Sequence, residues 1–299
     1  MRKLLQISRN WGFIHLLKIC LTLIWRHFPW PKGKGKYFTK QFVEKIITLP
    51  GFVPMWTKAG WLFLEKQDDI LQNTLFMNGV HYEKEITNFI EKNISLSSKA
   101  TVFDVGSHVG YYTLLLAKKV GDQGKIFAFE PQPKLAKGLK SSLELNRINW
   151  VKVENLAVTA SCGQVVLFQT PDSGRTSIAD LLYEKKQTLE VSTISLDGYI
   201  ENHDLPIPEL VKMDIEGAEW FAIKGMTDLL TSQHPPMLIV EMHPAQIEVL
   251  GGTIEGFISC ILQTNKYDLY WIHPRQGLMK LSESLPQKTT WHLFAQPRV

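Results

Sequence analysis

The chain has 299 residues, 44% of them hydrophobic and 21% charged, a composition that argues against a disordered protein and leaves room for one large α/β domain. Its net charge is a modest +4. The cysteines, Cys20, Cys162 and Cys260, are widely spaced, which argues against a disulfide framework and against a thiolate metal cluster. A reducing, cytoplasmic location is therefore expected.

Residues 1–43 form a basic arm that holds nine of the 33 Lys and Arg residues and none of the 29 acidic residues. Its apolar stretch from Phe13 to Trp25 is interrupted by Lys18, is too short for a membrane span, and is not followed by a small-residue cleavage site. Two interpretations stay open: a helix packed on the domain, or a peripheral helix that contacts anionic lipid. No nucleic-acid-binding motif is present, so a nucleic-acid partner is not expected.

After this arm the spacing of apolar residues predicts a strand over 61–70 and a helix over 81–94, and from residue 99 onward strands and helices alternate. The expected strands span 101–105, 124–130, 151–158, 163–170, 188–196, 209–215, 235–243, 267–273 and 290–296. The expected helices span 110–120, 133–146, 218–230 and 253–265. We divide the chain into a basic amphipathic segment (1–50), a lead-in region (51–98) and an α/β domain (99–299).

This alternation predicts right-handed crossovers and a doubly wound, Rossmann-like, mainly parallel sheet. The last two expected strands have no helix between them. In such sheets ligands bind beyond the carboxyl ends of the strands, so the residues that end the strands are the first site candidates. They are Asp104, Glu130, Ala157, Asp214, Glu241 and His243.

A glycine-rich turn follows the first strand of the domain, in the stretch from Asp104 to Gly110. Its glycines, Gly106 and Gly110, allow a backbone to approach a ligand closely, as in phosphate-binding loops. His108 stands where a dinucleotide fingerprint has its second glycine, so an adenosine cofactor without phosphates fits better than a pyrophosphate. Asp104 could then meet an ammonium group of that cofactor. The same spacing also fits a tight turn without a ligand.

Two acidic positions favour a nucleoside pocket over a bare turn. Glu130 ends the next strand, where an acid can accept two hydrogen bonds from a ribose diol, although a lone solvated glutamate is the alternative. Asp214 ends a buried strand in "LVKMDIEGAEW". Helix capping accounts for Glu219 and also fits Glu216, but it does not account for Asp214, which we expect to face the cleft.

His243 closes the strand in "IVEMHP" and could take a proton from a substrate hydroxyl, because the pKa of an imidazole is near neutrality. A histidine that only hydrogen-bonds a neighbour is the alternative. Asp214, Glu241 and His243 could also bind a divalent cation such as Mg²⁺ or Mn²⁺, but three candidate ligands without geometry do not establish a site, and no metal is predicted.

Several stretches between about Lys99 and Pro244, together about half the chain, resemble the FkbM family of S-adenosylmethionine-dependent methyltransferases. They are "FDVGSHVGYYTLLLA", "GKIFAFEPQPKLAKGLKSSLELN", "VENLAVTASCGQVVLF", "VSTISLDGYI", "PELVKMDIEGAEWFAIKGM" and "PPMLIVEMHP". The block "KMDIEGAE" is the most specific of them, and "GVHYEKEITNFI" is similar to the family's lead-in helix. His108 departs from the family, which usually has a small or amide residue there.

The resemblance implies a class I methyltransferase fold, whose seven-stranded sheet contains an antiparallel late strand. By the same likeness Gly106 and Gly110 line the methionine end of the cofactor, Glu130 holds the ribose, Ala157 borders the adenine and Asp214 lies near the transferred methyl. The full set of expected S-adenosylmethionine contacts is Asp104, Gly106, His108, Gly110, Tyr111, Glu130, Ala157 and Asp214.

The expected reaction is methyl transfer to a hydroxyl of a small-molecule or glycan acceptor, which is a sugar, a glycoconjugate or a secondary metabolite. His243 is the first candidate base and Asp214 the second, with Glu216 as an orienting partner. The insertion "TPDSGRTS", with Arg175 and Ser177, either shapes the acceptor site or is a plain surface loop. An NAD-linked oxidoreductase and a non-catalytic membrane-associated module are the alternative functions.

Overall fold

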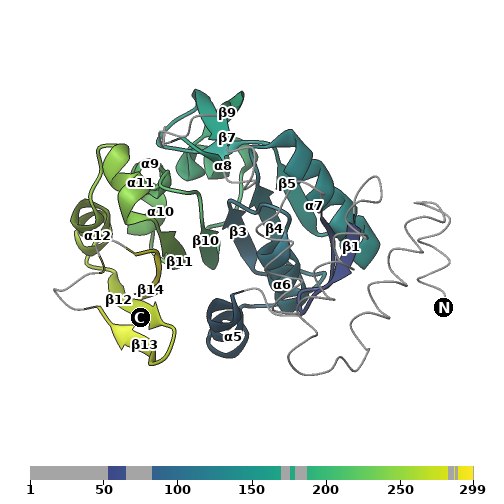
Figure 1. Cartoon of the computed structure of the whole chain (residues 1–299). Coiled ribbons are helices and arrows are strands. Elements are labelled where there is room, and N and C mark those ends of the chain that lie inside the picture. The colour runs from purple at the N-terminus through teal and green to yellow at the C-terminus, as the bar shows by residue number, and fades with distance from the viewer. Residues whose placement is uncertain are drawn as a thin grey trace, which may run out of the picture.

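The computed structural model describes residues 53–64, 83–169, 176–178, 187–281, 286 and 289–298. The basic arm and Arg175 lie outside these ranges. No helix among the described residues is long and apolar enough to cross a membrane. The described residues form a three-layer α/β structure around one large sheet (Figure 1).

The large sheet contains eight strands in the order β13-β12-β14-β11-β10-β3-β4-β5. Their bounds are β3 Thr101–Val105, β4 Lys125–Phe129, β5 Val151–Glu154, β10 Leu210–Met213, β11 Met237–Met242, β12 Tyr267–His273, β13 Gly277–Lys280 and β14 Trp291–Pro297. The strands from β11 to β5 pair in parallel, and β14 lies antiparallel between β11 and β12. The mainly parallel sheet with an antiparallel late strand is confirmed. Instead of seven strands there are eight, because β13 adds a hairpin partner to β12.

Helices cover both faces of this sheet. One face carries α5 (Lys84–Asn93), α6 (Tyr111–Val120) and α7 (Pro133–Asn146). The other carries α8 (Leu196–His203), α9 (Glu219–Ala222), the 3-10 helix η1 (Ile223–Gly225), α10 (Thr227–Thr231), α11 (Pro244–Val249) and α12 (Ile254–Leu262). In Figure 1, α10, α11 and α12 lie to the left, and α6 and α7 lie to the right.

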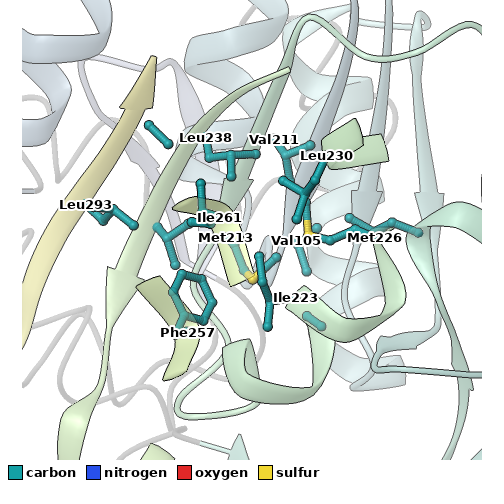
Figure 2. Packing of buried hydrophobic residues seen from close by; sticks show 14 of the residues in the cluster. Val105, Val211, Met213, Ile223, Met226, Leu230, Leu238, Phe257, Ile261 and Leu293 are labelled. Carbon is teal, nitrogen blue, oxygen red and sulfur yellow. The ribbon is translucent and has the colours of Figure 1, made fainter. Parts of the chain in front are cut away.

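Figure 2 shows the apolar layer between the second set of helices and the sheet. Val105, Val211 and Leu238 from three neighbouring parallel strands contact residues of the short helices, among them Ile223 and Phe257. These side chains are fully or almost fully buried, and burial of each aliphatic side chain contributes about 1.5–3 kcal/mol. This layer holds the carboxyl ends of the strands in a fixed position.

Local structure also differs from the sequence-based expectation within the domain. The strand expected over 151–158 is split into β5 and β6 (Ala157–Val158), which belong to different sheets. The helix expected over 218–230 is divided into α9, η1 and α10. At Gly225, the last residue of η1, an added Cβ would lie 2.4 Å from the carbonyl oxygen of Thr159. Helix α8 was not expected; the Ser195 hydroxyl accepts a hydrogen bond from the Gly198 amide and caps it.

A second sheet, with the order β6-β9-β7-β8, lies above the main sheet in Figure 1. It consists of β6, β7 (Gly163–Gln169), β8 (Thr176–Ser177) and β9 (Gln187–Ile194), so it contains the strands expected over 163–170 and 188–196. The Ser177 hydroxyl donates a 2.6 Å hydrogen bond to the carbonyl of Glu216. This bond joins the second sheet to the turn after β10.

The lead-in region packs on the domain. Strands β1 (Val53–Trp56) and β2 (Trp61–Leu64) form a hairpin whose Trp61 and Phe63 amides donate to Asn146 and Ser142 of α7. Leu62 is buried in the same core cluster as α6 and α7. Residues 53–64 and 83–98 therefore share the domain's core.

Candidate active site

A cavity of about 340 Å³ opens at the carboxyl ends of the parallel strands. Among the residues expected from the sequence, it is lined by Gly106, His108, Tyr111, Glu130, Ala157, Asp214, Glu216, Glu241 and His243. Asp104 and Gly110 are not among the lining residues. The structure therefore brings most of the predicted residues together around one space, although they are distributed over more than 130 positions of the chain.

The two glycines of the turn after β3 allow close approach of different neighbours. Gly106 has φ +79°, and a Cβ at this position would lie 1.8 Å from the backbone oxygen of Asp214. Gly110 has φ +90°, and its Cβ would lie 2.1 Å from Leu139 of α7. Gly106 thus allows two strand ends to approach each other beside the cavity, whereas Gly110 allows α6 to pack on α7 and does not face the cavity.

Asp104 is completely buried, and one of its oxygens accepts a 2.5 Å hydrogen bond from the Thr113 hydroxyl. Burial raises the pKa of this carboxyl group, although the Lys212 ammonium partly opposes the effect. The sequence suggested that Asp104 meets a ligand's ammonium group. The structure instead places it behind the cavity wall, next to a lysine of the protein.

Glu130 follows β4 directly and lies in the cavity wall. One of its carboxylate oxygens accepts a 2.8 Å hydrogen bond from the His108 amide, and the other accepts a 2.9 Å bond from the Gln132 amide. Burial raises the pKa of Glu130, opposed by His108 and by these amides. Each oxygen keeps a second lone pair, so this carboxylate can accept two further hydrogen bonds.

Asp214 follows β10 and is paired with Lys212, whose ammonium lies 3.2 Å from its Oδ2. Burial would raise the pKa of Asp214, but the charges of Lys212 and His243 outweigh burial and hold that pKa well below its usual range. Lys212 is 2% exposed and also lies over the Tyr112 ring, 4.7 Å from its centroid. Burial would lower the lysine's pKa, but Asp214 and Asp104 raise it. The pair therefore stays charged inside the wall.

His243 follows β11, and its ring is held between carboxylates. Its Nδ1 lies 3.0 Å from Oε1 of Glu219. Its Nε2 lies 3.7 Å from Oε2 of Glu216 and 3.9 Å from Oδ1 of Asp214 and Oε1 of Glu241. Burial would lower the pKa of His243, but these carboxylates, Glu219 foremost, raise it to about 10. The hydrogen-bonded partner of this ring is thus Glu219, and Glu216, the expected orienting residue, is farther away.

Glu219 was assigned to helix capping from the sequence, and this assignment is incomplete. Its Oε1 does accept a 2.9 Å hydrogen bond from the Ile215 amide, ahead of α9. The side chain is nonetheless completely buried and contacts His243 through the same oxygen.

Four residues at or beside the cavity were not expected from the sequence: Lys212, Glu83, Tyr112 and His292. Glu83 precedes α5, and its Oε2 accepts a 2.6 Å hydrogen bond from the Tyr112 hydroxyl. His292 of β14 lies opposite Glu241, with 3.6 Å between its Nε2 and Oε2 of Glu241. Burial lowers the pKa of His292 to about 3, whereas burial together with Asp214 and Glu83 raises the pKa of Glu241 to about 9. A lysine inside the apolar strand "ELVKMDI" was the one signal that could have marked Lys212.

Two groups of these residues have the composition of a cation site. Asp214, Glu241 and His243 each offer one ligand atom within 4.8 Å of the others, and so do Glu83, Glu241 and His292. Carboxylate oxygens with imidazole suit a divalent cation. In the first group, Lys212 already supplies a positive charge next to Asp214.

Comparisons with known proteins agree with the sequence motifs. The family model described as "Methyltransferase FkbM domain" matches residues 104–267, more than half of the chain. The hexuronic acid methyltransferase AglP of Haloferax volcanii is 28% identical over 142 residues, which are 48% of this chain and 55% of AglP. The methyltransferase sdnD of Sordaria araneosa is 27% identical over 186 residues, which are 58% of this chain and 68% of sdnD.

The chain thus spans about half to two thirds of the length of these curated relatives. Among solved structures, the methyltransferase FkbM of Methylobacillus flagellatus KT superposes with a TM-score of 0.49 and 14% identity, covering 96% of this chain and 61% of that one. The family match confirms the resemblance that the motifs indicated. The chain belongs to the FkbM family of methyltransferases.

Proposed function

We propose that the protein transfers a methyl group from S-adenosylmethionine to a hydroxyl oxygen of a sugar, a glycoconjugate or a secondary metabolite. The observation that carries the proposal is the placement of Glu130. Its carboxylate is fixed by two backbone amides at the end of β4, in the wall of a cavity above parallel strands. This is the position at which a ribose diol can donate two hydrogen bonds to a strand-end acid.

The rest of the cavity accommodates the other parts of this cofactor. Leu156, Ala157, Leu167 and Ile178 supply an apolar surface for the adenine ring. On the opposite side, the turn at Gly106 and the carboxylates near Asp214 supply polar groups for the methionine end. A sulfonium is cationic, and Asp214, whose pKa is held well below its usual range, supplies an ionised carboxylate that can stabilise it. The cofactor supplies the activated methyl group, and the protein aligns it with the acceptor.

In the transfer step the acceptor oxygen attacks the methyl carbon, the bond between that carbon and sulfur breaks, and S-adenosylhomocysteine leaves as a neutral thioether. The hydroxyl proton passes to a base, for which His243 is the first candidate and Asp214 the second. In the free protein His243 holds a proton on both ring nitrogens at neutral pH, since its pKa is raised to about 10. To act as the base, His243 would first have to release the proton on Nε2, so that this nitrogen could accept the proton of the hydroxyl.

The acceptor class is supported by the relatives, one of which is named a hexuronic acid methyltransferase. The screen that tests it supplies methyl-labelled S-adenosylmethionine with hexuronic acids, neutral hexoses and aminosugars in parallel. Label in a base-stable methyl ether supports O-methylation. Label only in an amine of the aminosugars would replace O-methylation by N-methylation.

The cofactor proposal is tested by calorimetric titration with S-adenosylhomocysteine. We expect the wild-type protein to bind it and not to bind NAD, and Glu130→Ala to weaken binding by at least about a hundredfold, because two hydrogen bonds to a charged group are lost. Glu201→Ala, which removes an exposed carboxylate on α8, is the matched control and should bind as the wild type does. Equal affinity in Glu130→Ala, or binding of NAD alone, would contradict the proposal.

Metal removal is expected to have no effect. Dialysis against EDTA should leave methyl transfer unchanged, because Lys212 and His243 already balance the carboxylates around Asp214. The measurement is the initial rate before and after dialysis, with and without added Mg²⁺ or Mn²⁺. A loss of rate that added metal restores would place an ion in one of the two carboxylate and histidine groups.

A further inference from the structure

We infer that Glu219 is a positioning residue for methyl transfer, which holds the His243 ring so that Nε2 faces the cavity. The inference rests on the proposed function. It gives a role in that reaction to Glu219, which its position at the start of a helix would explain as a cap alone. Glu219 does not line the cavity, so it acts through His243 and not on the substrate.

The geometry at Glu219 fixes which nitrogen of His243 keeps its proton when the ring is neutral. An ionised carboxylate can only accept hydrogen bonds, so the 3.0 Å contact with Oε1 requires a proton on Nδ1. Nε2 is then the nitrogen available for the acceptor's hydroxyl. Among the described residues, the groups that face Nε2 are Glu216, Asp214 and Glu241, at 3.7–3.9 Å, which is beyond hydrogen-bonding distance.

The same oxygen ties the ring to the turn after β10. Oε1 of Glu219 also accepts from the Ile215 amide at 2.9 Å. Asp214, the neighbour of Ile215, and His243 come from two adjacent strands, and Glu219 is bonded to both segments at once. One carboxylate therefore sets the position of the candidate base relative to Asp214.

Capping alone does not explain a charged residue here. A neutral side chain of the same size would be less costly to bury at this position, because a carboxylate that is removed from water is unfavourable unless it is paired. Glu219 is 0% exposed, and its Oε2 has no hydrogen-bond partner among the described residues. The imidazole of His243 is the group that pairs with this buried charge.

The decisive variant is Glu219→Gln, which preserves size. A glutamine amide can donate as well as accept, so it allows a tautomer of His243 with the proton on Nε2, and that nitrogen then cannot take a proton from the hydroxyl. We expect kcat, measured with the best acceptor of the sugar screen, to fall by about a hundredfold while both KM values change little. Glu219→Asp keeps an acceptor-only carboxylate and should recover part of kcat. Glu248→Gln, an exposed change on α11, should behave as the wild type.

A spectroscopic measurement on the full chain gives a result that does not depend on activity. In protein labelled with ¹⁵N-histidine, the Nδ1 proton of His243 should give a downfield signal protected from exchange, assigned by its loss in His243→Asn. The signal should persist in Glu248→Gln and disappear in Glu219→Gln, with unchanged circular dichroism.

Persistence of the signal and of kcat in Glu219→Gln would overturn the inference. Absence of the signal in the wild type would overturn it as well. If the signal behaves as expected but no acceptor is methylated, the proposed reaction is wrong and the positioning of His243 by Glu219 stands. The two failures are therefore distinguishable.

Discussion

Replacing His243 by asparagine is expected to lower kcat by about a hundred- to ten-thousandfold, the range that general base catalysis contributes. The pH profile should change too. A base must lose its proton before it can act, so kcat/KM of the wild-type protein should rise with pH from neutral to alkaline values, because the pKa of His243 is raised. The variant should lack this rise. The measurement is the initial rate of label transfer at several pH values.

The control for this prediction is His234→Asn, which changes an exposed histidine in the segment before β11. It should retain both the rate and the pH profile. Binding of S-adenosylhomocysteine should remain similar in His243→Asn, because Glu130 holds the far end of the cofactor in the proposed arrangement. If kcat stays within about threefold of the wild type, His243 is not the base, and Asp214 becomes the first candidate.

Replacing Gly106 by alanine is expected to destabilise the protein by about 3 kcal/mol or more, since both the positive φ and the steric overlap are unfavourable. The added Cβ would lie 1.8 Å from the carbonyl oxygen of Asp214, a backbone atom of an adjacent strand that cannot move without disturbing the sheet. For a chain of 299 residues the loss corresponds to a melting temperature that is lower by about 5 °C or more. Thermal unfolding followed by circular dichroism measures it, and cofactor binding should weaken in parallel because Asp214 is displaced.

Gly277→Ala is the matched control. Gly277 has φ +74°, close to the +79° of Gly106, but nothing lies within 4 Å of a Cβ at that position. Gly277→Ala therefore introduces backbone strain without a steric overlap, and it should destabilise the protein by about 1 kcal/mol. Equal destabilisation by the two substitutions would mean that the contact with Asp214 is unimportant and that only the dihedral angle matters.

Local patterns in the sequence were sufficient to predict the order of most strands and helices in the α/β domain. Alternation of apolar strands with amphipathic helices depends on neighbouring residues, so α6 and α7 were expected within a residue of their observed starts. The antiparallel late strand was implied by the family resemblance, and the two expected strands without a helix between them agreed with it. The break at Gly225 and the division of 151–158 between two sheets were not foreseen. The close approach of Gly225 to Thr159 and the pairing of β6 with β9 join residues that are distant in the sequence.

In the candidate site, too, local patterns predicted some features, and others depend on contacts between residues that are distant in the sequence. Glu130, Asp214 and His243 could be selected from the sequence because the carboxyl ends of parallel strands meet at one edge of a sheet. The sequence could not show that Glu219 reaches back to His243, that Glu83 reaches the site from the lead-in region, or that Asp104 lies behind the cavity wall. Those placements arise from side-chain directions and burial, which no spacing rule specifies.

The sequence by itself determined the family, the doubly wound architecture and the strand ends around which a site forms, since these follow from local periodicity and short motifs. Tertiary structure alone decided how the charges are distributed there. Lys212 with Asp214, Glu219 with His243 and Glu241 with His292 are brought within 4 Å by strand pairing and by the turn after β10. Burial then sets which of these groups holds a proton, because interactions between charges strengthen as water is excluded.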